Sequence, residues 1–272
     1  ISLRCNPNVN PNTHPYISTG LLNNKFGIPM RDVPRLYRLA HEHPWLEPVG
    51  IDCHIGSQIT TIGPFTESVD KLLDMVELLR SEGIRLTHLD IGGGLGIVYT
   101  ARDRPPEPAK LVEEVRAHMT ARNLEDLTLL AEPGRSIVGN AGVLLTKVEY
   151  IKTGPTKTFC IVDAAMTDLI RPALYDAWMA IEPVVERAEA PRLMDVVGPV
   201  CESTDVLGKN RELAIREGDF LAIFDAGAYG ASMASNYNSR ALPMEYLVDG
   251  EQVRMLRIPQ TWQDFTRGEV AL

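Results

Sequence analysis

The chain has 272 residues, of which 44% are hydrophobic and 23% charged, a composition typical of a globular protein with a sizeable core. Acidic residues outnumber basic ones, 36 against 27, and no segment collects Lys and Arg alone, so neither a nucleic acid nor a membrane surface is an expected partner. A small-molecule ligand fits this composition better.

The four cysteines, Cys5, Cys53, Cys160 and Cys201, have neither the spacing of a zinc site nor that of a disulfide framework. We therefore predict no metal site and a reducing, cytoplasmic location. No apolar run approaches the roughly 20 residues that a membrane helix needs.

The first half of the chain alternates strand-like runs with amphipathic helices. Strands are predicted at 2–5, 49–53, 86–91 and 127–131, and helices at 32–41, 64–82 and 109–121. Such a βαβ series predicts parallel strands with right-handed crossovers. Loops that contain glycine follow three of the strands, as at the active-site face of a (β/α)8 barrel or of a doubly wound sheet. The number of strands does not decide between these two folds.

The second half is richer in strands. They are predicted at 143–151, 158–162, 193–197 and 220–224, with one helical insertion around 169–181. We therefore predict two domains, an α/β domain over residues 1–139 and a β-rich domain, barrel-like or sandwich-like, over 140–272. A complete barrel takes about 250 residues, so we expect that residues 1–139 hold only its C-terminal half.

Two of the loops could bind an anion. A glycine-rich turn such as Gly92-Gly93-Gly94 lets backbone N–H groups approach a phosphate, although a tight turn between strand and helix explains it equally well. In the next loop, Glu132-Pro133-Gly134-Arg135 adds a guanidinium that could bind a phosphate or carboxylate. A Glu–Arg surface pair is the equal alternative there.

Other candidate residues are individually weak. His54 ends a strand, where a hydrogen-bonded structural role is more common than catalysis, and Cys201 fits a proton donor better than a nucleophile because carboxylates surround it. Arg171 and Tyr175 share one helical face and could hold a carboxylate, or could be a surface cation and a half-buried ring. Tyr229, between two glycines, could approach a ligand or simply follow a turn.

Nine short motifs, taken together and in order, are far more specific than any one of them. They are Arg4-x-Asn6-Pro7, His14-Pro15-Tyr16-Ile17-x-Thr19-Gly20, Lys25-Phe26-Gly27, His54-Ile55-Gly56-Ser57-Gln58, Leu89-Asp90-Ile91-Gly92-Gly93-Gly94, Glu132-Pro133-Gly134-Arg135, Arg171-Pro172-Ala173-Leu174-Tyr175, Cys201-Glu202-Ser203-x-Asp205 and Gly227-Ala228-Tyr229-Gly230. Over nearly its whole length the chain thus resembles the diaminopimelate decarboxylases, alanine-racemase-like (fold-type III) enzymes that use pyridoxal 5'-phosphate (PLP). The resemblance implies a PLP-binding barrel followed by a β domain, and removal of CO2 from meso-diaminopimelate to give L-lysine, the last step of lysine biosynthesis.

The resemblance also implies roles for individual residues in binding PLP. Those implied to bind the cofactor are Ser57, Gly92, Gly93, Gly94, Glu132, Pro133, Gly134, Arg135 and Tyr229. Among them, Glu132 would keep the pyridine nitrogen protonated, so that the ring accepts electrons, while His54 would stack on the ring face.

For the substrate, the resemblance implies contacts from Arg135, Arg171, Tyr175, Glu202 and Tyr229. Glu202 would pair with the distal ammonium, and Cys201 would return a proton after CO2 leaves. In this family the Cys comes from the neighbouring subunit, so a homodimer with shared active sites is expected.

One departure from the family is large. No Lys here matches the family's Schiff-base Lys, which lies well before the Arg-x-Asn-Pro segment, and Lys25 corresponds to a different position. We therefore expect an N-terminally truncated copy that is inactive alone. Two alternatives stay open, a decarboxylase of ornithine or arginine and a non-catalytic regulatory homologue, although a regulator would not need Glu132, Cys201 and Glu202 together.

Overall fold

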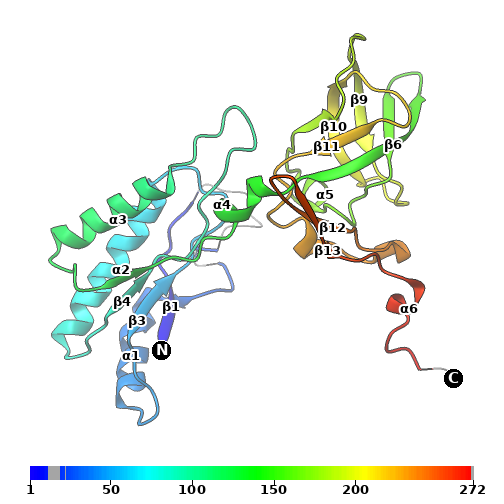
Figure 1. Ribbon diagram of the computed structural model, residues 1–272. Coiled ribbons are helices and arrows are strands. Elements are labelled where there is room, and N and C mark those ends of the chain that lie inside the picture. Colours follow the sequence, from blue (N-terminus) through cyan, green and yellow to red (C-terminus); the bar gives the residue numbers. More distant parts are fainter. Residues whose placement is uncertain (12–18, 22, 271–272) are drawn as a thin grey trace. The chain divides into compact units, whose positions relative to one another are not determined.

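The computed structural model describes residues 1–11, 19–21 and 23–270. The chain divides into two compact units, Ile1–Ile137 and Val138–Leu272, close to the boundary predicted at residue 139. Figure 1 shows the helices of the first unit and the strands of the second.

The first unit is a five-stranded sheet in which the strand order is β2-β1-β3-β4-β5 and all pairings are parallel. Its strands are β1 (Ser2–Asn6), β2 (Ile28–Pro29), β3 (Gly50–Cys53), β4 (His88–Asp90) and β5 (Thr128–Leu130). Its helices are η2 (Met30–Asp32), α1 (Val33–Glu42), α2 (Gly63–Ser81), α3 (Pro108–Ala121) and α4 (Arg135–Val138). The predicted parallel βαβ series is confirmed.

Each long helix of this unit begins with a proline in its first turn. Pro34, Pro64 and Pro108 occupy the first or second helical position of α1, α2 and α3. A proline fits there because the first N–H groups of a helix have no partner within the helix, and because its fixed φ is already helical. The sequence thus marks where each helix begins.

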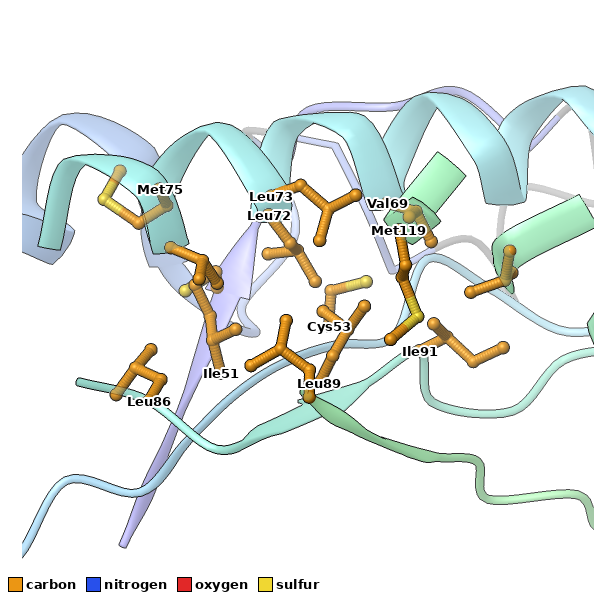
Figure 2. Packing of buried hydrophobic residues seen from close by; sticks show 14 of the residues in the cluster. Ile51, Cys53, Val69, Leu72, Leu73, Met75, Leu86, Leu89, Ile91 and Met119 are labelled. Carbon is orange, nitrogen blue, oxygen red and sulfur yellow. The ribbon is translucent and has the colours of Figure 1, made fainter. Parts of the chain in front are cut away.

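The core of the first unit lies between one face of the sheet and α2. Alternate strand residues, Ile51 and Cys53 on β3 and Leu89 on β4, point toward Leu72 of α2 (Figure 2), and all four are at most 1% exposed. Several residues of the opposite parity are polar and only partly buried, such as Asp52 of β3 and Asp90 of β4. The second face of the sheet therefore carries polar side chains, together with the exposed Leu130 of β5.

The second unit is a six-stranded sheet with the order β10-β9-β7-β6-β11-β8, plus a separate two-stranded sheet. The six strands are β6 (Leu144–Thr153), β7 (Thr158–Val162), β8 (Ile181–Pro183), β9 (Arg192–Val197), β10 (Val206–Leu213) and β11 (Phe220–Ile223). Pairing is antiparallel except between β7 and β9, and the end strands β8 and β10 also contact each other, so the sheet curls toward a barrel.

The remaining elements of this unit are short. The separate sheet pairs β12 (Glu245–Asp249) with β13 (Gln252–Arg257). The helical segments are η3 (Gly139–Ala141), α5 (Arg171–Tyr175), η4 (Ala231–Met233), η5 (Tyr237–Ser239) and α6 (Trp262–Phe265). Among the described residues, no helix combines the length and the hydropathy that a membrane span requires.

The helical insertion predicted at 169–181 is wrong in extent. Only Arg171–Tyr175 is α-helical, because Asp176 takes a left-handed conformation (φ 49°) and ends the helix. Ile181 begins a strand instead, since it pairs with Ile223 of β11. Sheet pairing that is distant in sequence here overrides the local helical pattern.

Strand β10 was not predicted at all. Register shifts interrupt its pairing with β9 between Val206 and Gly208 and again between Gly208 and Arg211. Asn210, between them, has a positive φ of 52°. Such bulges break the strict alternation of side chains by which a strand is recognised in a sequence.

Leu72 and Leu78 of α2 provide a test of where the core lies. Leu72 is 0% exposed and Leu78 is 42% exposed. Truncating Leu72 leaves a cavity, so we expect Leu72→Ala to lower the free energy of unfolding by about 3 kcal/mol, and Leu78→Ala to lower it by about 0.5 kcal/mol. Urea denaturation followed by circular dichroism measures both values. Equal losses would contradict the packing described.

Candidate functional site

Three loops meet at the carboxyl edge of the parallel sheet in the first unit. The amide of Gly93 donates to Nδ1 of His54 at 3.1 Å, and the amide of Glu132 donates to the carbonyl of Gly92 at 2.8 Å. Arg135 Nη2 donates to the Ser57 hydroxyl at 3.1 Å. The structure therefore brings together the loops that follow β3, β4 and β5, as parallel strands require.

The glycines between these loops are needed because backbone packs directly on backbone. Gly92 and Gly94 have positive φ values of 68° and 104°. A Cβ at Gly92 would overlap the carbonyl oxygen of Cys53, and a Cβ at Gly94 would overlap that of Gly56. Close contact of the chain with itself thus accounts for these glycines before any ligand is considered.

Two of the three backbone amides in the glycine turn already donate hydrogen bonds within the first unit. Gly92 N–H donates to Asp90 Oδ1 at 2.8 Å and Gly93 N–H donates to His54. Of the three glycine amides, that of Gly94 has no hydrogen bond to the described residues. In this arrangement Gly94 is the glycine whose N–H is available to an anion.

Arg135 is buried, with only 5% of its surface exposed, at the start of α4. Its guanidinium donates to the hydroxyls of Ser57 and Tyr99 and lies 5.6 Å from the centre of the Tyr99 ring. A buried guanidinium surrounded by hydroxyls is a suitable donor set for a phosphate. It is not the exposed surface pair with Glu132 that the sequence left open.

Tyr99 was not among the predicted site residues. It is 9% exposed and its hydroxyl accepts a hydrogen bond from Arg135. Its backbone amide donates to Asp103 Oδ2 at 3.0 Å, which fixes the loop after the glycine turn. No local sequence pattern predicts such a residue, because a single tyrosine in a loop can be either exposed or buried.

His54 is held as a neutral ring. Its Nδ1 accepts the Gly93 amide, and its carbonyl accepts the Thr19 hydroxyl at 2.7 Å and Arg4 Nη2 at 3.4 Å. Burial lowers the pKa of His54 and the positive charge of Arg4 lowers it further, against a smaller opposite effect of Asp90. Arg4 and Thr19, both from the matched motifs, thus serve to place His54. Residues 14–17 of the same motif lie outside the described residues.

The rest of the third loop is exposed. Glu132, Pro133 and Gly134 are all on the surface of the first unit, directly before the buried Arg135. A Cβ at Gly134 would meet nothing within 4 Å. Glu132 therefore lies in the same group of loops as His54, Ser57 and Arg135, with an exposed side chain.

In the second unit, α5 carries Arg171 and Tyr175 at its two ends, as the sequence predicts. Arg171 is 6% exposed and its Nη1 lies 3.2 Å from Met179 Sδ, while Tyr175 is partly buried. Arg171 is also close to Asp225, whose pKa is raised by burial and lowered by Asn140 and the Arg171 charge. The helix is therefore near the loop that carries Tyr229.

Tyr229 has the left-handed conformation, with φ 61°, and its ring is 42% exposed. Two backbone hydrogen bonds fix the loop before Tyr229. The Ala226 amide donates to the Gly142 carbonyl at 2.8 Å, and the Gly227 amide donates to the Gly139 carbonyl at 3.1 Å. A non-glycine residue at positive φ is uncommon and costs free energy, so the surrounding bonds must hold it. The two backbone hydrogen bonds of Ala226 and Gly227 support this conformation.

Cys201 and Glu202 lie on an exposed loop after β9. The buried Asp205 fixes this loop, accepting the amide of Met166 at 2.6 Å and that of Val200 at 2.7 Å. The Asp of the Cys-Glu-Ser-x-Asp motif thus has a structural role that the sequence did not reveal.

The comparisons with known proteins match both units. Residues 1–139 match the family described as "Pyridoxal-dependent decarboxylase, pyridoxal binding domain", and residues 97–227 match its "C-terminal sheet domain". This chain belongs to the pyridoxal-dependent decarboxylases. Its first unit is accordingly part of a (β/α)8 barrel, and the second unit is the β-rich domain of that family.

Relatives within the family are named diaminopimelate decarboxylase. That of Pseudomonas aeruginosa is 52% identical over 272 residues, which are 100% of this chain and 65% of the relative. The chain thus spans about 65% of the length of such a curated relative. The crystal structure of diaminopimelate decarboxylase from Helicobacter pylori complexed with L-lysine is 41% identical, with a TM-score of 0.90 over 98% of this chain and 66% of that one. Lysine decarboxylase from Selenomonas ruminantium is more distant, at 26% identity and a TM-score of 0.75 over 88% of this chain and 60% of that one.

Arg4 provides a test of the electrostatics around His54. Arg4→Met removes a positive charge, so we expect the pKa of His54 to rise toward its ordinary value of 6.5 without reaching it, because burial remains. Nitrogen-15 NMR of the histidine ring measures this pKa, and Arg31→Met, at a side chain that is 85% exposed and pairs with Asp32, is the control.

The same pKa shift has a consequence for stability. Because the folded pKa lies below the unfolded one, the neutral His54 ring stabilises the fold above about pH 6.5, and this contribution is lost as the pH falls through the lower folded value. Arg4→Met should reduce that loss. A His54 pKa that does not change in the variant would contradict the role of Arg4.

Gly94 provides a test of the packing between loops. A Cβ there would have an unfavourable φ and would overlap the Gly56 carbonyl, so we expect Gly94→Ala to lower the free energy of unfolding by about 3 kcal/mol. Gly134→Ala, at an open position, should change it by less than about 0.5 kcal/mol. Guanidinium denaturation compares the two variants, and equal stability would show that the loops are not packed as described.

Proposed function

We propose that this protein removes CO2 from meso-diaminopimelate to give L-lysine, the last step of lysine biosynthesis, with PLP as its cofactor. The observation that carries the proposal is the 52% identity to the diaminopimelate decarboxylase of Pseudomonas aeruginosa, which extends over the whole of this chain. The similarity to a diaminopimelate decarboxylase structure complexed with L-lysine supports the same substrate class.

The first unit fits the phosphate of PLP. Its buried Arg135, next to the Ser57 hydroxyl, supplies charge and donors, and the glycine turn Gly92-Gly93-Gly94 lies in the adjoining loop. Tyr229, in the second unit, would assist.

The same edge fits the ring of the cofactor. The flat, neutral His54 side chain suits stacking against it, and the exposed Glu132 carboxylate suits a protonated pyridine nitrogen. Glu132 precedes Arg135 by three residues, with Pro133 and Gly134 between them. When bound, PLP supplies an electron sink for the bond that loses CO2.

For the substrate, the proposal assigns carboxylate contacts to Arg135 and Arg171, with hydroxyls from Tyr175 and Tyr229. Glu202 would pair with the distal ammonium of the substrate, for which its exposed carboxylate is suited. The Cys201 thiol, also exposed, would give its proton to the α-carbon in place of the lost carboxylate.

The proposal includes a homodimer in which Cys201 and Glu202 serve the neighbouring subunit's site, as the family resemblance implies. It also includes a cytoplasmic location, which the four free thiols support, because a reducing compartment keeps cysteines unpaired.

A product assay tests the proposed reaction. The 272 residues, alone and joined to the part of the Pseudomonas aeruginosa relative that this chain does not cover, would be loaded with PLP and given diaminopimelate, ornithine or arginine. We expect the joined form to make L-lysine from meso-diaminopimelate and to prefer that substrate at least about 100-fold, since only it satisfies Glu202 and the carboxylate contacts together.

The matched variant is Glu132→Gln, which should lower kcat about 100-fold while leaving PLP bound, because it weakens the partner of the pyridine nitrogen. Glu125→Gln, in the loop before β5, is the control. Turnover of ornithine or arginine in preference would overturn the substrate, and absence of any PLP absorbance would favour a regulatory homologue.

A further inference from the structure

An exposed glutamate needs a partner if it is to bind a ligand in one orientation. Glu202 has three rotatable side-chain bonds and is exposed on the loop after β9. Freezing such a side chain when a ligand binds costs conformational entropy, and that cost weakens binding unless the orientation is already set.

The structure supplies this partner from a distant segment. The hydroxyl of Tyr237, 35 residues along the chain, donates to Glu202 Oε1 at 2.5 Å. On the other side of the same carboxylate, the Thr204 hydroxyl lies 3.5 Å from Oε2. Both hydroxyls face the same carboxylate, but the Tyr237 contact is much the shorter, so Tyr237 provides the main hydrogen bond.

The segment that carries Tyr237 is itself fixed. It is the short helix η5, in which Asn238 and Ser239 have positive φ values of 55° and 53°. Asn236 Nδ2 spans this helix by donating to the Arg240 carbonyl at 2.8 Å, and it also donates to Gln260 Oε1 at 2.7 Å.

Arg240 then attaches the segment to the body of the second unit. Its Nη2 donates to the Asp163 carbonyl at 2.6 Å, and its Nε donates to the Thr167 hydroxyl at 3.2 Å. The Ser235 amide donates to the Thr167 carbonyl at 3.0 Å. A backbone with two uncommon conformations, held at both ends, is a rigid support for a tyrosine.

The protonation of the Tyr237 hydroxyl suits this role. Glu202 raises the pKa of Tyr237, first through the hydrogen bond and then through its charge, so the hydroxyl keeps its proton as the donor. One oxygen of Glu202 is thereby occupied, and among the described residues the second faces only the Thr204 hydroxyl at 3.5 Å. That oxygen is left for a cationic group of a ligand.

We propose that Tyr237 is a positioning residue that orients the Glu202 carboxylate toward the distal ammonium of the substrate, and so contributes to selection for a chain with a positive charge at its far end. This inference rests on the proposed function of Glu202. Tyr237 itself need not touch the substrate.

The test compares two ligands that differ only in the distal amino group. The distal amino group of diaminopimelate is kept as the α-amino group of L-lysine, because CO2 leaves from the other end. 6-Aminohexanoate is lysine without this α-amino group, so the ratio of the two affinities reports the Glu202 interaction. Both would be measured by isothermal titration calorimetry on the PLP-loaded, dimeric protein in the form that makes lysine. The same titrations would be run on Tyr237→Phe, on Glu202→Gln and on the double variant.

We expect Tyr237→Phe to weaken lysine binding about fivefold and to leave 6-aminohexanoate binding unchanged. Because Tyr237 acts through Glu202, the double variant should bind lysine no more weakly than Glu202→Gln alone. In steady-state kinetics, Tyr237→Phe should raise KM for diaminopimelate with kcat changed less than about twofold. Tyr246→Phe, on the exposed strand β12, is the matched control and should have no effect.

Three results would overturn the inference in distinguishable ways. If Glu202→Gln weakens lysine binding but Tyr237→Phe does not, only the positioning role fails. If Tyr237→Phe weakens the binding of lysine and of 6-aminohexanoate equally, its role is general stability of the loop. If Glu202→Gln leaves lysine binding unchanged, the proposed function of Glu202 fails and the positioning role fails with it.

Discussion

The candidate site depends on backbone packing against backbone at the carboxyl edge of the parallel sheet. There, Gly92 and Gly94 allow the loop after β4 to press against the carbonyls of Cys53 and Gly56 in the loop after β3. Because no side chain separates the loops, the Gly93 amide reaches the His54 ring and the Glu132 amide reaches the Gly92 carbonyl. This contact thus fixes the loops that carry His54 and Glu132.

In the second unit, Cys201, Glu202 and Tyr229 lie on exposed loops rather than at the edge of a parallel sheet. Polar side chains hold two of its segments. The buried Asp205 holds the loop of Cys201, and the partly exposed Arg240 holds the segment of Tyr237. Burial raises the pKa of the Asp205 carboxyl, while the two amides that it accepts lower it. A buried carboxyl is costly unless it is hydrogen-bonded, so Asp205 fixes its loop in one arrangement.

Much of the first unit could be predicted, because hydrophobic periodicity and prolines mark its helices and glycines mark its loops. The second unit was less predictable. Strand β10 was not predicted because its bulges disrupt the alternation of side chains. The helix at α5 was predicted too long because the local sequence does not reveal the pairing of Ile181 with Ile223. For the site, motif order supplied the candidate residues, which stay predictions, whereas the contacts of Tyr99, Asp205 and Tyr237 form only in the folded chain.

The two amides that Asp205 accepts come from different segments, one from Val200 in its own loop and one from Met166 before α5. The loop therefore depends on a second segment of the chain for its conformation. Transplanting residues 199–205 into another decarboxylase to transfer its substrate preference would leave the carboxylate without half of its partners, unless the segment around residue 166 were moved with it. Recombination that respects this pairing should yield folded hybrids more often than recombination that cuts between the two segments.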